Sequence, residues 1–290
     1  MTSSTTHPLV VVGITTRNRA AILSKAITSA LAQAYPAILV SVLDDGSTDD
    51  TWTLQKLFPN VRWHRHELSR GIIDSRNHLM QTALGSYYVS LDDDAWFIRG
   101  DEIADAVARM EADPQLGAIA FDILSPDRPD LVERSPARQA GMFIGCGHML
   151  RLSAASEAGY YAPTPGTYGS EERDLSLRLA DMGYGIELLP GVHVWHDKAW
   201  TGRDWFPLHR SGVCNELVMT LRRCPFPDLL FVLPLKVASY VRYWLLNPSF
   251  LRAGVFGLGD FLRFGPAIWR SRRPVSRATF WRLGKGSHVR

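Results

Sequence analysis

The stretch YYVSLDDDAWF, residues 87–97, joins an apolar run to three adjacent aspartates, Asp92, Asp93 and Asp94. Three neighbouring carboxylates repel one another, and removing them from water costs free energy unless a cation lies nearby. The stretch therefore predicts a buried strand that ends either in a solvated turn or in a site for a positive charge.

The preceding segments alternate between the sequence periods of strands and helices. The predicted elements, in chain order, are strand 9–14, helix 20–34, strand 38–43, helix 49–58, strand 61–65, helix 74–83 and strand 86–91. Such a β-α-β series predicts an α/β fold with a doubly wound, mostly parallel sheet.

Three polar clusters fall at the carboxyl ends of these strands, at residues 15–19, 44–47 and 92–94. In open α/β sheets, ligands bind in the crevice beyond the carboxyl ends of the strands. One cluster could arise by chance, since D-G and S-T-D also favour turns and helix caps. Three clusters indicate a single site.

The first strand is followed by GITTRNRA, which holds one glycine and neither a G-x-G-x-x-G motif nor a Walker lysine. A nucleotide bound here would need another group to neutralise its phosphates. A divalent cation held by the aspartates at 92–94 would supply that charge.

The order of the segments GITTRNRA, SVLDDGSTDDT, RGIIDSRNHLMQTALGSYYVSLDDDAW, GCGHMLRLS and GSEERDLSLRLADMGY resembles family 2 glycosyltransferases of the GT-A (Rossmann-like) fold. The likeness covers roughly residues 8–197. It implies a metal-dependent transferase that moves a sugar from a nucleoside diphosphate and inverts the anomeric configuration in one step.

The resemblance also implies a role for individual donor-binding residues. Asp45, the second aspartate of DDGS, would accept a hydrogen bond from a pyrimidine ring N–H, which predicts a UDP- or dTDP-sugar. Thr15 and Arg17 would line the nucleotide pocket. Arg76 would lie near the phosphates and the sugar of the donor.

A metal site is implied by the match of the aspartate triplet to the D-x-D motif of the family. Asp94 would bind Mn²⁺ or Mg²⁺, while Asp92 and Asp93 would hold the metal shell or the ribose and sugar hydroxyls. The spacing in PGVHVWHD favours His196 over His193 as a further ligand.

The base of the family lies in a Glu-Asp motif that opens a helix, and here the motif reads Glu171-Glu172. Position matching gives Glu172 the role of general base, with Asp174 as the fallback. A purely structural interpretation stays open, because acidic side chains stabilise the first turn of any helix.

The C-terminal part differs in charge from the rest of the chain. From Leu229 onward it holds 11 Lys and Arg and a single acid, a net charge of +10, whereas the whole chain carries +3. Segments 229–246 and 249–269 predict basic amphipathic helices that suit an anionic membrane surface. Pro234, Lys236 and Arg242 argue against a transmembrane helix, and a helical pair packed on the catalytic domain or at a dimer contact is the alternative.

These observations predict a catalytic domain at residues 1–227, a basic helical tail at 228–290, and a cytoplasmic enzyme that is peripheral on the inner face of the membrane. The N-terminal segment lacks the features of a signal peptide, and three scattered cysteines fit a reducing compartment. The expected acceptor is a saccharide, plausibly lipid-linked, in surface polysaccharide assembly. The alternatives are a sugar nucleotidyltransferase and a non-catalytic, membrane-bound nucleotide-sugar binding module. Nucleic acid is not an expected partner, because no reading motif is present.

Overall fold

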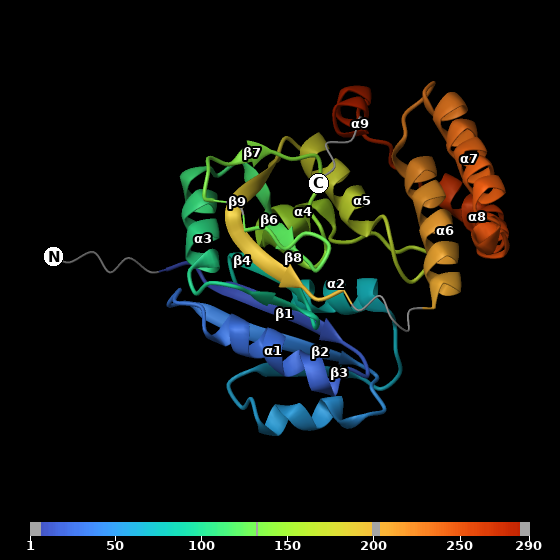
Figure 1. The fold of residues 1–290 in the computed structure, drawn as a ribbon. Coiled ribbons are helices and arrows are strands. Elements are labelled where there is room, and N and C mark those ends of the chain that lie inside the picture. The colour runs from blue at the N-terminus through green and yellow to red at the C-terminus, as the bar shows by residue number, and fades with distance from the viewer. Residues whose placement is uncertain (1–6, 132, 199–203, 285–290) are drawn as a thin grey trace.

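The computed structural model describes residues 7–131, 133–198 and 204–284. A mixed sheet forms the centre, with helices on both faces and a layer of C-terminal helices beside it (Figure 1). The strands are β1 (Val10–Thr16), β2 (Ile38–Asp45), β3 (Arg62–His66), β4 (Tyr87–Asp92), β5 (Ala95–Phe97), β6 (Leu116–Leu124), β7 (Arg138–Gln139), β8 (Gly147–Arg151) and β9 (Gly185–His196). The helices are α1 (Ala20–Leu31), η1 (Asp50–Lys56), α2 (Ile72–Thr82), α3 (Glu102–Ala112), α4 (Leu152–Ala158), α5 (Glu171–Asp181), α6 (Trp205–Arg223), α7 (Leu229–Leu246), η2 (Pro248–Phe250), α8 (Leu251–Arg270) and α9 (Arg277–Gly284).

The strand order is β3-β2-β1-β4-β8-β6-β9-β5, and β7 pairs with β9. Strands β3, β2, β1 and β4 are parallel, and β8 runs antiparallel between β4 and β6. The predicted doubly wound, mostly parallel sheet is therefore confirmed.

The helix predicted at residues 49–58 is the 3₁₀-helix η1, which covers residues 50–56. Thr51 and Thr53 are β-branched and have low α-helix propensity. The Asp49 carboxylate accepts a hydrogen bond from the Thr51 amide and fixes the start of this short turn.

Both faces of the sheet are buried, which explains why the strands read as continuous apolar runs. Val10 and Ile14 of β1 pack with α1 and α3 on one face. Val11 packs on the opposite face, in the cluster that contains side chains of α2, α4 and α5.

The C-terminal helices form a third core, as the alternative of a helical pair packed on the catalytic domain predicted. Helix α6 packs against α8 and α7, and α9 packs against α5. The guanidinium of Arg223 on α6 lies 2.7 Å from the carboxylate of Asp174 on α5, which ties this layer to the sheet domain. The domain boundary between residues 227 and 228 stays a prediction. Helix α6 lies before this boundary and α8 lies after it, but the two helices share one hydrophobic core.

Among the described residues, α7 is the single helix with the length and composition of a membrane span, at a mean hydropathy of 1.4 over 18 residues. Core helices of other proteins share these two properties, so they do not establish a span. Only 11% of α7 is buried, so much of its apolar surface has no partner among the residues that the structure describes.

Candidate active site

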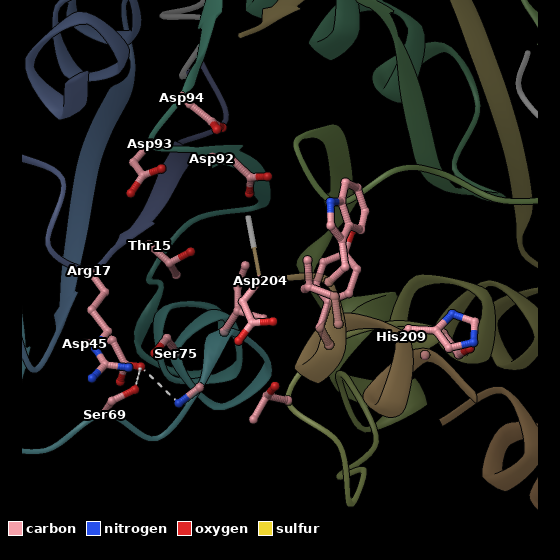
Figure 2. A pocket seen from close by; sticks show the side chains of 18 of the residues that line it. Thr15, Arg17, Asp45, Ser69, Ser75, Asp92, Asp93, Asp94, Asp204 and His209 are labelled. Atoms are coloured by element: carbon pink, nitrogen blue, oxygen red, sulfur yellow. Dashed lines mark hydrogen bonds between the residues drawn. The ribbon is translucent and has the colours of Figure 1, made fainter. Parts of the chain in front are cut away.

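The three polar clusters meet in a cavity of about 1010 Å³ at the carboxyl ends of β1, β2 and β4. Thr15, Arg17, Asp45 and the 92–94 triplet line it from the sheet side. Figure 2 shows the aspartates and Thr15 on one side of the cavity and His209 on the other. Strand register contributes to this convergence, because Thr15 on β1 lies directly beside Asp92 on β4.

Asp45 lies at one end of the cavity, enclosed by the loop at residues 66–71. Its oxygens accept hydrogen bonds from the Ser69 hydroxyl at 2.7 Å (Figure 2). They also accept from His66 Nδ1 at 2.8 Å and from the amides of Arg70 and Gly71, both at 2.9 Å. Burial favours a raised pKa, but these four donors lower the pKa of Asp45 to about 2. Asp45 is therefore a carboxylate that its own chain holds in place.

Gly46 allows this loop to close over Asp45. Its φ of +71° lies in the left-handed region, and a Cβ on it would lie 2.7 Å from the Ser69 amide nitrogen. Any side chain at residue 46 would push the loop away from the carboxylate.

Each of the three aspartates has a different partner. Asp92 lies 2.6 Å from Arg76, Asp93 accepts a hydrogen bond from the Thr16 hydroxyl at 2.8 Å, and Asp94 accepts one from Arg19 at 2.9 Å. The positive charges beside the triplet in the described chain thus come from Arg76 and Arg19.

Burial and neighbours shift the pKa values within the triplet in opposite directions. Burial raises the pKa of Asp93 to about 7, against the opposing effect of the Arg19 charge. Burial would also raise the pKa of Asp94, but the hydrogen bonds and charges of His196 and Arg19 lower it. Asp94 is therefore the stronger candidate for an ionised ligand.

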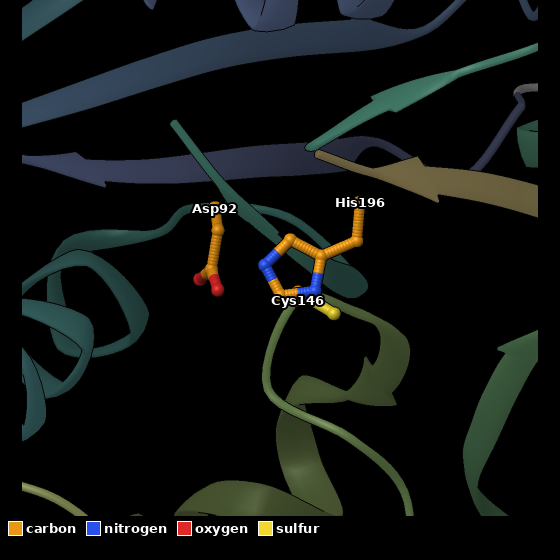
Figure 3. A group of neighbouring side chains, drawn as sticks. All are labelled: Asp92, Cys146 and His196. Carbon is orange, nitrogen blue, oxygen red and sulfur yellow. The ribbon is translucent and has the colours of Figure 1, made fainter. Parts of the chain in front are cut away.

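A cluster that could hold a metal ion consists of Asp92, Cys146 and His196, whose ligand atoms all lie within 4.8 Å of one another (Figure 3). His196 Nε2 also lies 3.2 Å from an oxygen of Asp94. The buried Nδ1 of His196 has no hydrogen-bond partner among the residues described. The carboxylate suits Mn²⁺ or Mg²⁺, whereas the imidazole and the thiol are ligands of transition metals such as Zn²⁺ and are not typical ligands of Mg²⁺.

One member of this cluster differs from the sequence expectation, because Cys146 was missed although it lies in the quoted segment GCGHMLRLS. Arg19, which pairs with Asp94, lies in the predicted 15–19 cluster but was given no role of its own. His193, the less favoured histidine, lies outside the cluster, with Nε2 3.8 Å from Asp122.

Arg76 is only 2% exposed and does not line the cavity; it lies among three carboxylates. Besides Asp92, its guanidinium lies 3.4 Å from Glu172 and 3.5 Å from Glu171. Burial would lower the pKa of Arg76, but these charges raise it well above its usual value. Arg76 therefore stays charged and holds Asp92 and Glu172 on either side of it.

Glu172 begins α5 next to this arginine. Burial, together with the charge of Glu171, raises the pKa of Glu172 to about 8. Gly145 makes the close approach possible, since a Cβ there would lie 2.4 Å from Glu172 Oε1 and 2.6 Å from Arg76 Nη1.

Asp174, the fallback base, is engaged elsewhere. Its carboxylate lies 2.7 Å from Arg178 and 2.7 Å from Arg223. Burial would raise its pKa, but the two arginines lower it. Asp174 is therefore a structural anion between α5 and α6.

Residues 11–158 match the family model described as Glycosyl transferase family 2. A relative from Escherichia coli, "UDP-Glc:alpha-D-GlcNAc-diphosphoundecaprenol beta-1,3-glucosyltransferase WfaP", is 30% identical over 89 residues, which are 30% of this chain and 35% of the relative. The aligned part thus spans about a third of that relative's length.

Two solved structures share the fold over nearly the whole chain. The mannosyltransferase PcManGT from Pyrobaculum calidifontis, in complex with GDP-Man and Mn²⁺, superposes with a TM-score of 0.61 at 19% identity, covering 98% of this chain and 80% of that one. S. aureus TarS 1-349 in complex with UDP-GlcNAc gives a TM-score of 0.66 at 14% identity, covering 97% and 93%.

Proposed function

The chain belongs to glycosyl transferase family 2 and has the GT-A fold, and from this premise we propose that it is a metal-dependent, inverting enzyme with a UDP- or dTDP-sugar donor. The observation that carries the proposal is the grouping of Asp45, the 92–94 triplet and His196 around one cavity, with Glu172 behind its lining, 3.4 Å from the Arg76 guanidinium that also pairs with Asp92. This grouping would place a nucleobase acceptor, a cation site and a proton acceptor around one donor.

The metal site would consist of Asp94, Asp92 and His196, with Cys146 beside them. A bound Mn²⁺ or Mg²⁺ would supply Lewis-acid stabilisation of the departing diphosphate. Thr16 and Arg19 hold the triplet in place through Asp93 and Asp94.

Glu172 would take the proton from the attacking acceptor hydroxyl. Its raised pKa supports this role, because a general base is most effective when its pKa lies near the working pH. A single carboxylate base fits a one-step displacement with inversion. Arg76 would position Glu172 and Asp92 instead of contacting the donor directly, since it is buried behind them.

The acceptor is proposed to be a lipid-linked saccharide, and the enzyme peripheral on the inner face of an anionic membrane. Leu235 and Leu246 on α7 are 68% and 71% exposed, and Leu262 on α8 is 66% exposed. The basic side chains of Arg252 and Arg263 lie on α8, and apolar helices with basic residues bind anionic interfaces. The Escherichia coli relative is named for a lipid-linked acceptor.

The test is a thermal-shift panel of UDP, dTDP, CDP, ADP and GDP with and without Mn²⁺, followed by a turnover assay with UDP-sugars. A ligand at 100 times its Kd stabilises the native state by about 2.7 kcal/mol. We expect UDP or dTDP with Mn²⁺ to give the largest shift, and UDP-sugars to release UDP. Absence of any shift would overturn the donor assignment.

The same assay separates the alternatives. A sugar nucleotidyltransferase would form pyrophosphate from a nucleoside triphosphate and a sugar phosphate. A binding module would show the thermal shift and release no UDP from any UDP-sugar, even with acceptors present.

A further inference from the structure

The cavity has two walls of different chemistry. The sheet wall carries the carboxylates, hydroxyls and arginines described above. The opposite wall comes from α6, α7 and η2, and we call four of its side chains the aromatic wall: His209, Tyr240, Tyr243 and Phe250. A nucleoside diphosphate needs cations and polar groups, which the sheet wall supplies, so the aromatic wall is left for a second ligand.

Ring contacts make the aromatic wall one connected group. The ring of His209 lies 4.9 Å from that of Phe250 and stacks on Tyr243 at 5.9 Å, and Tyr243 lies 5.7 Å from Phe250. Tyr240 stacks on the buried Trp244 at 5.9 Å. Ring contacts of this kind hold the wall in a fixed geometry.

Trp244 also determines the proton position on His209. The indole Nε1–H of Trp244 donates to His209 Nε2 at 3.0 Å, so the neutral imidazole carries its proton on Nδ1. Burial lowers the pKa of His209, which favours this neutral form. Within the part of the chain that the structure describes, no group accepts from Nδ1. The aromatic wall thus offers one fixed N–H donor to a ligand.

Aromatic faces with a small number of hydrogen-bonding groups suit a ligand that has both an apolar face and polar edges. A sugar ring is such a ligand, with C–H groups on its faces and hydroxyls around its edge. Tyr243 is 41% exposed and offers its ring for such a contact.

Helix α7 connects this wall to the exposed apolar surface. Tyr240 and Tyr243 line the cavity, whereas Leu235, Leu245 and Leu246 of the same helix are 68–74% exposed. A saccharide with a lipid attached could therefore contact α7 with both parts: its sugar against the tyrosines and its chain along the leucines.

We propose that the aromatic wall is the acceptor subsite, and that it binds the terminal sugar of a lipid-linked saccharide, with the ring on Tyr243 and a hydroxyl accepting from His209 Nδ1–H. This inference rests on the proposed function and specifies which surface binds the acceptor.

The experiment uses the full chain, a UDP-sugar donor, and undecyl-diphosphate monosaccharides (glucose, galactose, N-acetylglucosamine and N-acetylgalactosamine) in detergent micelles. The parent identifies the best probe of the four. We expect Tyr243→Ala and His209→Phe to raise the KM for that probe at least 10-fold, while the KM for the donor and the thermal shift with UDP and Mn²⁺ change less than twofold. Tyr243→Phe, which keeps the ring, should stay within threefold of the parent.

Trp269→Ala is the matched control, since Trp269 is an exposed aromatic residue of α8 outside the cavity. Its acceptor KM should not change. An unchanged acceptor KM in Tyr243→Ala, or transfer by the parent to none of the four probes while UDP binding persists, overturns the acceptor subsite. Loss of UDP binding in the parent instead overturns the proposed function.

Discussion

The Arg76 guanidinium lies 2.6 Å from the Asp92 carboxylate, and both belong to elements that meet at the edge of the sheet. Arg76 also contacts Glu171 and Glu172 at the start of α5. One buried cation thus connects the end of β4, where a metal is proposed to bind, with the helix that carries the proposed base.

The first prediction concerns this cation. Arg76→Met should destabilise the protein by about 3–5 kcal/mol, because breaking a buried ion pair leaves carboxylates uncompensated. The loss should shrink at acidic pH, where the carboxylates take up protons. Urea unfolding of the parent and the variant at pH 5 and pH 8 measures both effects. Arg134→Met, at an exposed pair with Asp101, should cost less than about 1 kcal/mol; equal losses would contradict the role given to Arg76.

The second prediction concerns the metal ligands. Asp94→Asn should abolish the part of the UDP thermal shift that depends on Mn²⁺, while the melting temperature without ligand changes little. Cys146→Ser tests the ligand that sequence reasoning missed, and should change the preference between Mn²⁺ and Zn²⁺, because thiolates favour zinc. The assignment of Asp94 is wrong if its variant keeps the full Mn²⁺ effect.

The third prediction concerns the base. Glu172→Gln should lower kcat by ~10² or more at similar donor affinity, because the amide cannot accept the proton. For the parent, kcat/KM should fall as the pH decreases through about 8, the pKa of Glu172. Asp174→Asn should instead lower stability, since Asp174 pairs with two arginines. Near-normal turnover in Glu172→Gln would remove it from the mechanism.

The raised pKa of Glu172 also predicts that its replacement by Gln will stabilise the protein at high pH, although it lowers activity. Its pKa rises from 4.5 to about 8 on folding, so the fold favours the protonated form. The resulting stability is fully present below pH 4.5 and is lost as the pH rises through about 8. Glu172→Gln should therefore melt at a higher temperature than the parent at pH 9, with little difference at pH 4.5. A variant that melts lower at pH 9 would contradict the raised pKa.

The fourth prediction concerns the nucleobase. The Asp45 carboxylate can accept from the ring N–H of uracil or thymine when the base takes the place of one of its four donors, such as the Ser69 hydroxyl, whereas neutral cytosine presents an acceptor at the same position. UDP and dTDP should therefore stabilise the protein more than CDP does. Asp45→Asn should weaken UDP binding and also loosen the 66–71 loop, because an amide cannot accept four hydrogen bonds. Equal shifts with UDP and CDP would count against Asp45 as the reader of the base.

The fifth prediction concerns the C-terminal helices. The full chain should co-sediment with anionic vesicles, more strongly at low salt, since each basic side chain near such a surface contributes about 1 kcal/mol. Leu235→Glu with Leu246→Glu should reduce binding at every salt concentration, whereas Leu57→Glu, a charge placed on an exposed leucine far from α7, should not. A full chain that stays in the supernatant at low salt would instead make the surface a contact between copies. Lys285 and Arg290, two of the basic residues, lie outside the described part of the chain.

Much of the sheet was predictable, because strands buried on two faces must be apolar throughout. Val10 and Val11 pack into the hydrophobic cores on opposite faces of the sheet, and no polar residue interrupts strand β1 before Thr15. The position of the aspartate triplet was predictable for a related reason, because the apolar strand β4 ends at Asp92. The roles of Asp92, Asp94 and His196 as metal ligands stay predictions.

What could not be predicted depends on contacts between distant segments. Cys146 lies beside Asp92 and His196 because β8 pairs antiparallel with β4. No local sequence pattern predicts that pairing. The four donors around Asp45 come from a loop 21 to 26 positions away. Tyr243 looked like part of a membrane-facing helix, and its place in the cavity wall follows from the packing of α7 on α6.

Gly145 has a consequence for how variation in this protein should be interpreted. A Cβ there would lie 2.4 Å from Glu172 Oε1 and 2.6 Å from Arg76 Nη1, so every substitution must displace these two side chains, and a saturation mutagenesis library selected for transfer should recover mainly glycine at this position. A reader of such a library would score Gly145 as catalytic, although glycine has no side chain to act on a ligand. The intolerance would report the space that two charged neighbours occupy, and shortening residue 172 should restore the melting temperature of a Gly145→Ala variant without restoring its transfer activity.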